Sequence, residues 1–269
     1  MIHIAKKRWK AFAGVFAVLY ILIFLAKTPG IDAMVTAKMT LGAHRGSSVE
    51  FRENTIDAIK SAIENPKYNF VEFDVQYTKD NKIVVFHDWS LLRMQLKIMK
   101  ISELTYEEIT NMTDYHIPLY EEVIELIGNK KKVNIEIKPK GSLIGDYEED
   151  IKLTDYIISD CEQRGIKQDL MISSISPRII EYVSENYPEM KTGIVYWVTP
   201  ITYIPSERLV QNFYEKTEAM GADYILLHGI NVKNYDLLSE LKPEDTTLVF
   251  WYFNDKVFII ENASSAGSW

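Results

Sequence analysis

Apolar and polar residues alternate strictly over residues 71–75, so Val71, Phe73 and Val75 face one side of a predicted strand and Glu72 and Asp74 the other. More short apolar runs follow, and helical patterns separate most of them. Strands are predicted at residues 40–44, 71–75, 83–86, 133–137, 170–174, 192–198, 223–228 and 247–253. Helices are predicted from Asn54 or Thr55 onward, near 102–108, and at 118–127, 147–164, 177–186, 206–220 and 234–241.

Short apolar strands that alternate with helices are typical of an α/β protein with a parallel sheet. Seven or eight such strands, each ending in a polar group, favour a TIM (β/α)8 barrel over an open doubly wound sheet. In a barrel of this kind, the chemistry lies at the carboxyl ends of the strands. The chain contains neither of the glycine-rich phosphate loops of nucleotide-binding folds, so a nucleotide cradle is not supported.

The amino-terminal segment carries a separate signal. Residues 11–26 contain no charge, and they lie between a basic flank at 6–10 and Lys27. We expect one transmembrane helix here, with snorkelling lysines at its ends and the basic flank in the cytoplasm. A cleaved signal peptide or a buried helix are the alternatives, and residues 35–37 would suit a peptidase. The predicted division is therefore an anchor and linker at 1–37 and a catalytic domain at 38–269, single-pass and extracytoplasmic at the cell membrane.

Charge and cysteine content exclude several classes of function. The chain of 269 residues has 47% apolar residues and a net charge of −8, which is ample for a folded core. Residues 39–269 hold 24 basic and 37 acidic residues, a net charge of −13, so we expect no nucleic-acid partner. The single cysteine, Cys161, excludes an internal disulfide and a cysteine-based zinc site, and a small buried side chain is expected there.

Candidate chemistry gathers near the first strands. Glu72 and Asp74 lie about 7 Å apart on one strand face, and they repel each other unless a cation lies between them. The strands 40–44 and 83–86 deliver His44-Arg45 and His87-Asp88 at their ends. An acid pair, two histidines and an arginine together indicate metal-assisted chemistry on a phosphate.

Four motifs occur in order: His-Arg-Gly at 44–46, Glu-Asn-Thr at 53–55, Glu-x-Asp at 72–74 and His-Asp at 87–88. Residues 117–123, 134–138, 173–177 and 251–254 continue the pattern. Together these segments resemble the glycerophosphodiester phosphodiesterase family, a barrel similar to phosphatidylinositol phospholipase C. The resemblance covers about residues 40–255, and the ordered set of motifs is far more specific than any single one.

The resemblance implies one divalent cation held by Glu72, Asp74 and Glu136. It also implies that His44 and His87 act as acid and base. Hard oxygen ligands suit Mg²⁺ or Ca²⁺ better than zinc. Two imidazoles suit a reaction that deprotonates a nucleophile and protonates a leaving alkoxide. The nucleophile stays open between the glycerol 2-hydroxyl, which would give a cyclic phosphate, and water.

Arg45 and Lys138 are expected to hold phosphate oxygens, and Trp251 is a candidate for substrate contact. Structural alternatives exist for each residue. Arg45 could pair with Glu72 or Asp74, Lys138 could pair with its neighbour Glu136, and a strand tryptophan is most often core. His228 ends a predicted strand and could border the site.

The expected activity is metal-dependent hydrolysis of a small-molecule glycerophosphodiester to glycerol 3-phosphate and an alcohol. Cleavage of a teichoic-acid-type polyglycerophosphate, or of a lysophospholipid at the bilayer surface, is the enzymatic alternative. An inactive binding module tethered to the membrane is the alternative from a different class. An assay of phosphate release with glycerophosphocholine as substrate distinguishes an enzyme from a binding module.

Two segments depart from the family pattern. Residues 92–94 differ from the usual Leu-x-Arg-Thr-Thr in a region that often forms a lid over the substrate. Residues 262–269 do not resemble the family's usual ending, which supplies the last barrel strand. We therefore expect a barrel without its last strand and imperfectly closed, unless 83–86 counts as a strand of the ring.

Overall fold

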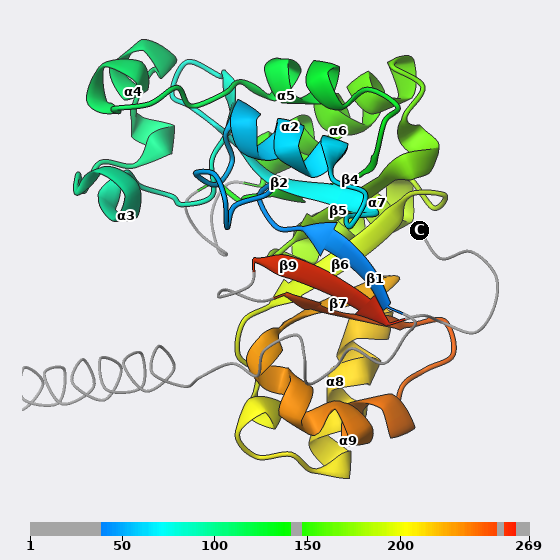
Figure 1. Cartoon of the computed structure of the whole chain (residues 1–269). Coiled ribbons are helices and arrows are strands. Elements are labelled where there is room, and N and C mark those ends of the chain that lie inside the picture. The colour runs from blue at the N-terminus through cyan, green and yellow to red at the C-terminus, as the bar shows by residue number, and fades with distance from the viewer. Residues whose placement is uncertain (1–38, 141–146, 252–255, 262–269) are drawn as a thin grey trace, which may run out of the picture.

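The computed structural model describes residues 39–140, 147–251 and 256–261, and within them nine strands form one sheet (Figure 1). Their order in the sheet is β1-β9-β8-β7-β6-β5-β4-β2-β3, and β1 also pairs with β2, which closes a ring of eight. The strands of the ring are β1 (Met39–Ala43), β2 (Phe70–Tyr77), β4 (Lys132–Ile137), β5 (Leu170–Ser174), β6 (Lys191–Tyr196), β7 (Tyr224–His228), β8 (Thr247–Trp251) and β9 (Val257–Glu261).

The ring confirms the predicted α/β barrel and corrects the expectation that it stays open. Seven strands run parallel, and the eighth, β9, runs antiparallel to both β1 and β8. Gly42 pairs with Phe70 of β2 on one side and with Phe258 of β9 on the other. Residues 257–260 are apolar throughout and buried, because a strand inside a closed barrel packs on both faces. The barrel therefore closes and loses its sheet edges without a parallel final strand.

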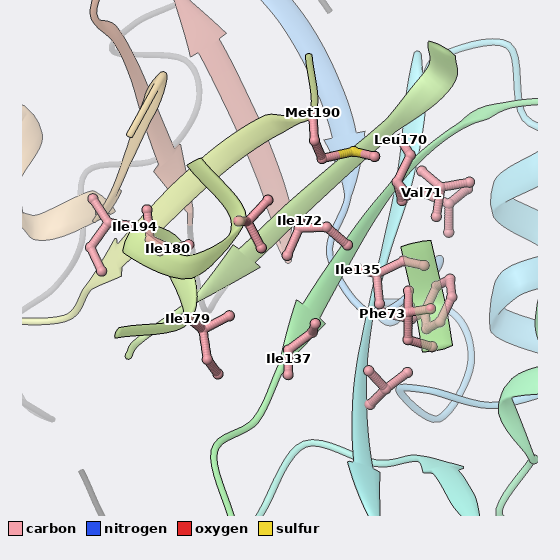
Figure 2. Close-up of a cluster of buried hydrophobic side chains, with 14 of the residues drawn as sticks. Val71, Phe73, Ile135, Ile137, Leu170, Ile172, Ile179, Ile180, Met190 and Ile194 are labelled. Atoms are coloured by element: carbon pink, nitrogen blue, oxygen red, sulfur yellow. The ribbon is translucent and has the colours of Figure 1, made fainter. Parts of the chain in front are cut away.

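In the described part of the chain, six helices cover the outside of the ring, and they confirm the helices predicted there. They are α2 (Ile56–Glu64), α5 (Tyr120–Ile127), α6 (Glu148–Gln163), α7 (Pro177–Asn186), α8 (Glu207–Ala219) and α9 (Tyr235–Glu240). Thr55, rather than Asn54, caps α2, because its side chain accepts from Ala58 N. Outward-facing side chains of the strands pack against this layer, as Figure 2 shows for Ile172 of β5 beside Ile180 of α7.

The strand β3 lies outside the ring and forms a hairpin with the end of β2. β3 (Ile83–Val85) pairs antiparallel with the last three residues of β2, so it is a strand, as predicted, but not a ring strand. The chain then forms α3 (Leu92–Gln95), η2 (Ile101–Glu103) and α4 (Tyr106–Met112), which stand apart from the helices around the ring (Figure 1). This insertion has its own apolar cluster, made of Val84, Phe86, Leu91, Ile101, Leu104, Ile109 and Ile117. Because β3 runs back along β2, Phe86 N donates to the Asp74 carbonyl at 3.0 Å, and His87 returns to the barrel.

The interior of the ring is apolar at one end and polar at the other. Its apolar cluster consists of Phe70, Met171, Tyr224, Leu226, Val249, Trp251, Phe258 and Ile260. At Gly42 an added Cβ would lie 2.0 Å from the Phe70 ring, so only glycine fits this position. The period-2 alternation of each strand carries polar residues inward at the carboxyl ends.

Three predictions concern residues that the structure does not describe. The predicted transmembrane segment 11–26, the boundary at 37/38 and residues 262–269 lie outside the described residues. Among residues 39–140, 147–251 and 256–261, no helix is long and apolar enough to cross a membrane.

Phe258→Ala should lower the free energy of unfolding by about 3–5 kcal/mol, the usual cost of removing a fully buried Phe ring. Inside the barrel, its ring centroid lies 5.0 Å from that of His44 and 6.0 Å from that of Phe70. Urea unfolding measures the change, and Ile204→Ala, at a side chain that is 67% exposed, serves as the control. Equal midpoints for Phe258→Ala and the unmodified protein would contradict the closure of the ring by β9.

Candidate active site

Three acidic side chains meet inside the barrel at its carboxyl end. Asp74 of β2 pairs in register with Glu136 of β4, and Glu72 lies two residues before Asp74 on the same inward face. One oxygen from each carboxylate lies within 4.8 Å of the others, and all three residues are buried. The structure therefore brings together the three residues that the sequence resemblance implied as metal ligands.

The chemistry of this acidic cluster fits a divalent cation. Glu72 Oε2 accepts from Arg45 N at 2.7 Å, whereas the buried Oε1 has no hydrogen-bond partner in the described part of the chain. Burial raises the pKa of Glu72 well above its usual value, and the nearby carboxylates of Asp74 and Glu136 raise it further. A cation between the three carboxylates would relieve both effects, and an all-oxygen set is the set that hard cations prefer. Glu72, Asp74 and Glu136 could hold such an ion.

Lys138 lies next to the same carboxylates. Its Nζ is 2.9 Å from Asp74 Oδ1 and forms a close ion pair with Glu136 Oε1. Burial by itself would lower the pKa of Lys138, but Asp74 and Glu136 raise it, so the ammonium stays charged. Burial would likewise raise the pKa of Asp74, yet Lys138, followed by His87 and Arg45, holds it far below its usual range. The pairing of Lys138 with Glu136, which was one of the structural alternatives, is thus present. It places the buried ammonium of Lys138 beside the acidic cluster.

The loop after β1 fixes two of the three carboxylates. Arg45 and Asn54 both adopt left-handed backbone conformations, with φ of 58° and 57°. Asn54 Nδ2 donates to Asp74 Oδ2 at 2.8 Å, while Arg45 N holds Glu72. In the sequence, Asn54 is a candidate helix cap and a member of the Glu-Asn-Thr motif, and neither predicts a contact with Asp74. Its role in orienting Asp74 depends on a contact across 20 residues, which no local pattern reveals.

A chain of ion pairs joins the two histidine-bearing loops. Arg45 Nη1 donates to Glu53 Oε1 at 2.8 Å, and the guanidinium of Arg93, on α3, binds the same carboxylate. Arg93 Nε also donates to Asp88 Oδ2 at 2.7 Å, and Asp88 Oδ1 lies 2.8 Å from His87 Nδ1. The positioning roles of Glu53, Asp88 and Arg93 were missed from the sequence, although the first two belong to its motifs.

Arg45 pairs with Asp74, as the structural alternative predicted, and also with Glu53, which that alternative did not include. Its Nε lies 3.5 Å from Asp74 Oδ2, as that alternative had it, but the shorter contact is the one to Glu53. With a side chain that is 7% exposed, the guanidinium is oriented by carboxylates on two sides.

The two histidines face the site in different surroundings. His44 is buried beside Phe258 and Trp251, and burial, with a contribution from Arg45, lowers its pKa well below the usual value. The His87 side chain is 29% exposed, and burial together with the charge of Lys138 lowers its pKa as well. Both rings are therefore neutral near pH 7. Because Asp88 accepts from Nδ1 of His87, Nε2 is the nitrogen that carries the lone pair.

A cavity of about 240 Å³ opens between these groups. Its polar wall is formed by His44, Arg45, His87, Asp88, Glu136 and Lys138. Its apolar wall is formed by Trp89, Ile175, Val195, Trp197, Trp251 and Phe258. Trp251, the candidate for substrate contact, lines this cavity. His228 packs against Trp251, with the two ring centroids 4.7 Å apart. Burial lowers the pKa of His228 to about 4.

An α/β barrel with a buried carboxylate cluster, two neutral histidines and two cations at its carboxyl end has the parts of a metal-assisted phosphate-processing site. Residues 44–262 match the Glycerophosphoryl diester phosphodiesterase family, and the chain belongs to this family. The sequence resemblance is thereby confirmed.

Individual relatives agree with this assignment. A glycerophosphodiester phosphodiesterase of Caldanaerobacter subterraneus is 34% identical over 165 residues, which are 57% of this chain and 65% of that protein. The solved glycerophosphodiester phosphodiesterase of Thermotoga maritima has 26% identity and a TM-score of 0.61, covering 81% of this chain and 88% of that one. A phosphodiesterase of Oleispira antarctica, solved with its product sn-glycerol-3-phosphate, shares the fold with a TM-score of 0.61 at 24% identity, over 79% and 84% of the two chains.

Glu53 should make the protein sensitive to acid. Burial would raise its pKa, but Arg45 and Arg93 lower it to about 2. A carboxylate whose pKa is lower in the folded state stabilises the protein above the unfolded-state pKa of about 4.3, and this stabilisation is lost as the pH falls toward 2. Glu53→Gln should therefore be less stable than the unmodified protein at pH 7 by about 3 kcal/mol, with the difference shrinking below pH 4.

Urea unfolding at a series of pH values measures this difference in stability, and Glu125→Gln, at an exposed position, is the control. A gap that is constant with pH would contradict this role of the ion pairs.

Proposed function

We propose that this protein hydrolyses glycerophosphodiesters to glycerol 3-phosphate and an alcohol, with one Mg²⁺ or Ca²⁺ bound by Glu72, Asp74 and Glu136. The observation that carries the proposal is the convergence of this acidic cluster with His44 and His87 on one cavity. Membership of the family and the product bound to the Oleispira relative agree with a glycerophosphate substrate.

The residues around the cavity have different roles in the proposed reaction. Arg45 and Lys138, which are both buried, bind phosphate oxygens, the first as a planar fork and the second as a point charge. When bound, the divalent cation polarises the phosphoryl group and offsets its developing charge. His87, oriented through Nδ1 by Asp88, offers Nε2 for proton transfer, and His44 is the second proton-transfer group. Trp251 forms the wall against which the organic part of the substrate lies.

Two nucleophiles are compatible with this arrangement. Attack by the glycerol 2-hydroxyl would release a cyclic phosphate before water opens it, whereas direct attack by water would not. Phosphorus NMR during turnover distinguishes the two routes by the presence of the cyclic species.

We also propose that residues 1–37 tether the domain to the cell membrane, with residues 38 onward on the outer side. The uncharged run at 11–26 and its basic flank support this proposal. Protease added to intact cells should reach the domain, and the membrane-bound protein should resist an alkaline wash. Cleavage of the domain only after cell lysis would overturn the proposed orientation.

The enzymatic activity is tested with glycerophosphocholine. The purified full chain, supplied with Mg²⁺ or Ca²⁺, should release glycerol 3-phosphate in an enzyme-coupled assay, and a chelator should stop the release. His44→Asn, prepared in the same way, controls for contaminating phosphodiesterases. Absence of release with either metal would favour the alternative of a binding module without activity.

A further inference from the structure

Exposed apolar side chains are concentrated at one end of the barrel. Of the large apolar residues that are exposed in the described part of the chain, only Tyr156 lies elsewhere, on α6. The others fall in three connections, and they are Val49, Phe51, Trp89, Leu92, Leu96, Ile98, Met99, Trp197, Val198, Tyr203 and Ile204. We call these eleven residues the apolar rim. Patches of this kind on a folded protein mark an interaction site.

Each of the three connections contributes residues to the cavity lining. They follow β1, β3 and β6, and Trp89 and Trp197 line the cavity although each is more than 40% exposed. The first two connections contact each other, because Arg93 pairs with Glu53. The third joins the cavity wall through Trp197, whose ring centroid lies 6.4 Å from that of Trp251. The apolar rim is thus continuous with the apolar wall of the site.

The charge of the rim differs from that of the rest of the domain. Residues 39–269 carry a net charge of −13, whereas the three connections at 47–53, 89–100 and 195–206 together carry +2, from four cations in the first two against Glu50 and Glu53. Residues 195–206 contain no charged residue at all. Arg93 pairs with Glu53 and Asp88, and Lys100 pairs with Glu103. Lys97 Nζ donates to the Met112 carbonyl, so its charge is not neutralised there. An apolar surface with excess positive charge is complementary to a lipid surface with anionic headgroups.

The most exposed side chains of the rim fit insertion into lipid. Leu96 is 87% exposed and Ile98 82% exposed, and both lie in or beside the short helix α3. Trp89 and Trp197, next to the cavity, are of the residue type that is enriched at membrane–water interfaces.

We propose that the apolar rim docks onto a lipid surface bearing anionic headgroups and that the cavity takes a glycerophosphodiester with one acyl chain, a lysophospholipid, from that surface. The proposal of docking depends only on the properties of the apolar rim, whereas the lysophospholipid substrate rests on the proposed function. The apolar wall formed by Trp89, Ile175 and Trp197 provides a continuous path from the rim to His44 and His87 for a chain-bearing substrate.

Docking is tested by a polarity-sensitive fluorophore on an introduced cysteine in the full chain. Cys161 is buried, and burial raises the pKa of its thiol to about 11, so an introduced cysteine takes the label. A label on Leu96→Cys should shift to the blue when vesicles of phosphatidylcholine with phosphatidylglycerol are added, and high salt should reduce the shift. A label on Gln168→Cys, which precedes β5 at the opposite end of the barrel, should not respond.

Because each label reports its own position, this readout is independent of membrane binding by residues 11–26. No shift at position 96, or an equal shift at position 168, would overturn the proposal. A shift at position 96 that depends on protein concentration but not on vesicles would show that the rim binds a second copy of the chain. That result would also overturn the proposal of lipid docking.

The substrate is tested by comparing two activities. Leu96→Ser with Ile98→Ser should lower turnover of lysophosphatidylglycerol in vesicles at least about tenfold, since two buried aliphatic side chains contribute that much to partitioning. Turnover of soluble glycerophosphocholine should stay unchanged. Tyr156→Ser, an exposed apolar residue outside the rim, is the matched control and should leave both activities unchanged. An equal effect of the double variant on both substrates would overturn the substrate assignment. Absence of both activities, with a normal fluorophore shift, would contradict the proposed function but not the docking.

Discussion

Replacing Glu72 by glutamine is expected to abolish turnover and, at the same time, to stabilise the metal-free protein. The loss of turnover should be about 10³-fold or more, since both the cation and its placement relative to the histidines are lost. The gain in stability has a separate cause. Glu72 is fully buried near Asp74 and Glu136, and burial and these like charges raise its pKa. Because the neutral amide removes this repulsion, unfolding should cost on the order of 1 kcal/mol more.

Thermal melts in chelator and in Mg²⁺ or Ca²⁺ separate the two effects. The unmodified protein should melt at a higher temperature when metal is added, because a ligand that binds only the folded state stabilises it. Glu72→Gln should start higher in chelator and respond less to metal. Asp150→Asn, at a buried acid outside the acidic cluster, should keep the full metal response. If the Glu72→Gln melt rises with metal as much as that of the unmodified protein, the assigned ligand set is wrong.

Loss of either histidine is the second large effect. His44→Asn and His87→Asn should each lower kcat about 10²–10⁴-fold, the usual value of a positioned acid or base. Asp88→Asn should have a smaller effect, because it only loosens the orientation of the His87 ring. Metal-induced stabilisation should persist in all three variants, since none of these residues belongs to the acidic cluster.

An activated substrate assigns the roles of the two histidines. A nitrophenyl ester of glycerophosphate has a leaving group that needs no proton. The variant that lacks the general acid should therefore regain most of its activity with it, whereas the variant that lacks the general base should not. Equal recovery of both variants, or of neither, would show that the two histidines do not divide acid and base catalysis.

Much of the site follows from local sequence. The alternation at 71–75 places Glu72 and Asp74 on one inward face, and the strand at 133–137 does the same for Glu136. Because parallel strands of a barrel all end on the same side, residues at their carboxyl ends must converge. The grouping of these residues with His44 is therefore predictable, and the described structure agrees with it.

Other features required the tertiary structure. Asn54 looks like a helix cap in sequence, but its amide binds Asp74 in the folded chain. Arg93 lies in an insertion whose sequence departs from the family pattern, and only folding brings its guanidinium between Glu53 and Asp88. These contacts join residues 5 to 40 positions apart, at angles that no local periodicity encodes.

The sequence by itself determined that the chain forms an α/β barrel of short strands, and which carboxylates and histidines point inward. Those properties depend on the spacing of side chains along a single strand, which is a local quantity. Only the tertiary structure decided that β3 lies outside the ring, that β9 closes it in the antiparallel direction, and that eleven exposed apolar residues lie in three connections at one end of the barrel. Strand direction and neighbours are set by which hydrogen-bond partners remain once the other strands have paired. That choice depends on the whole sheet and not on any one segment.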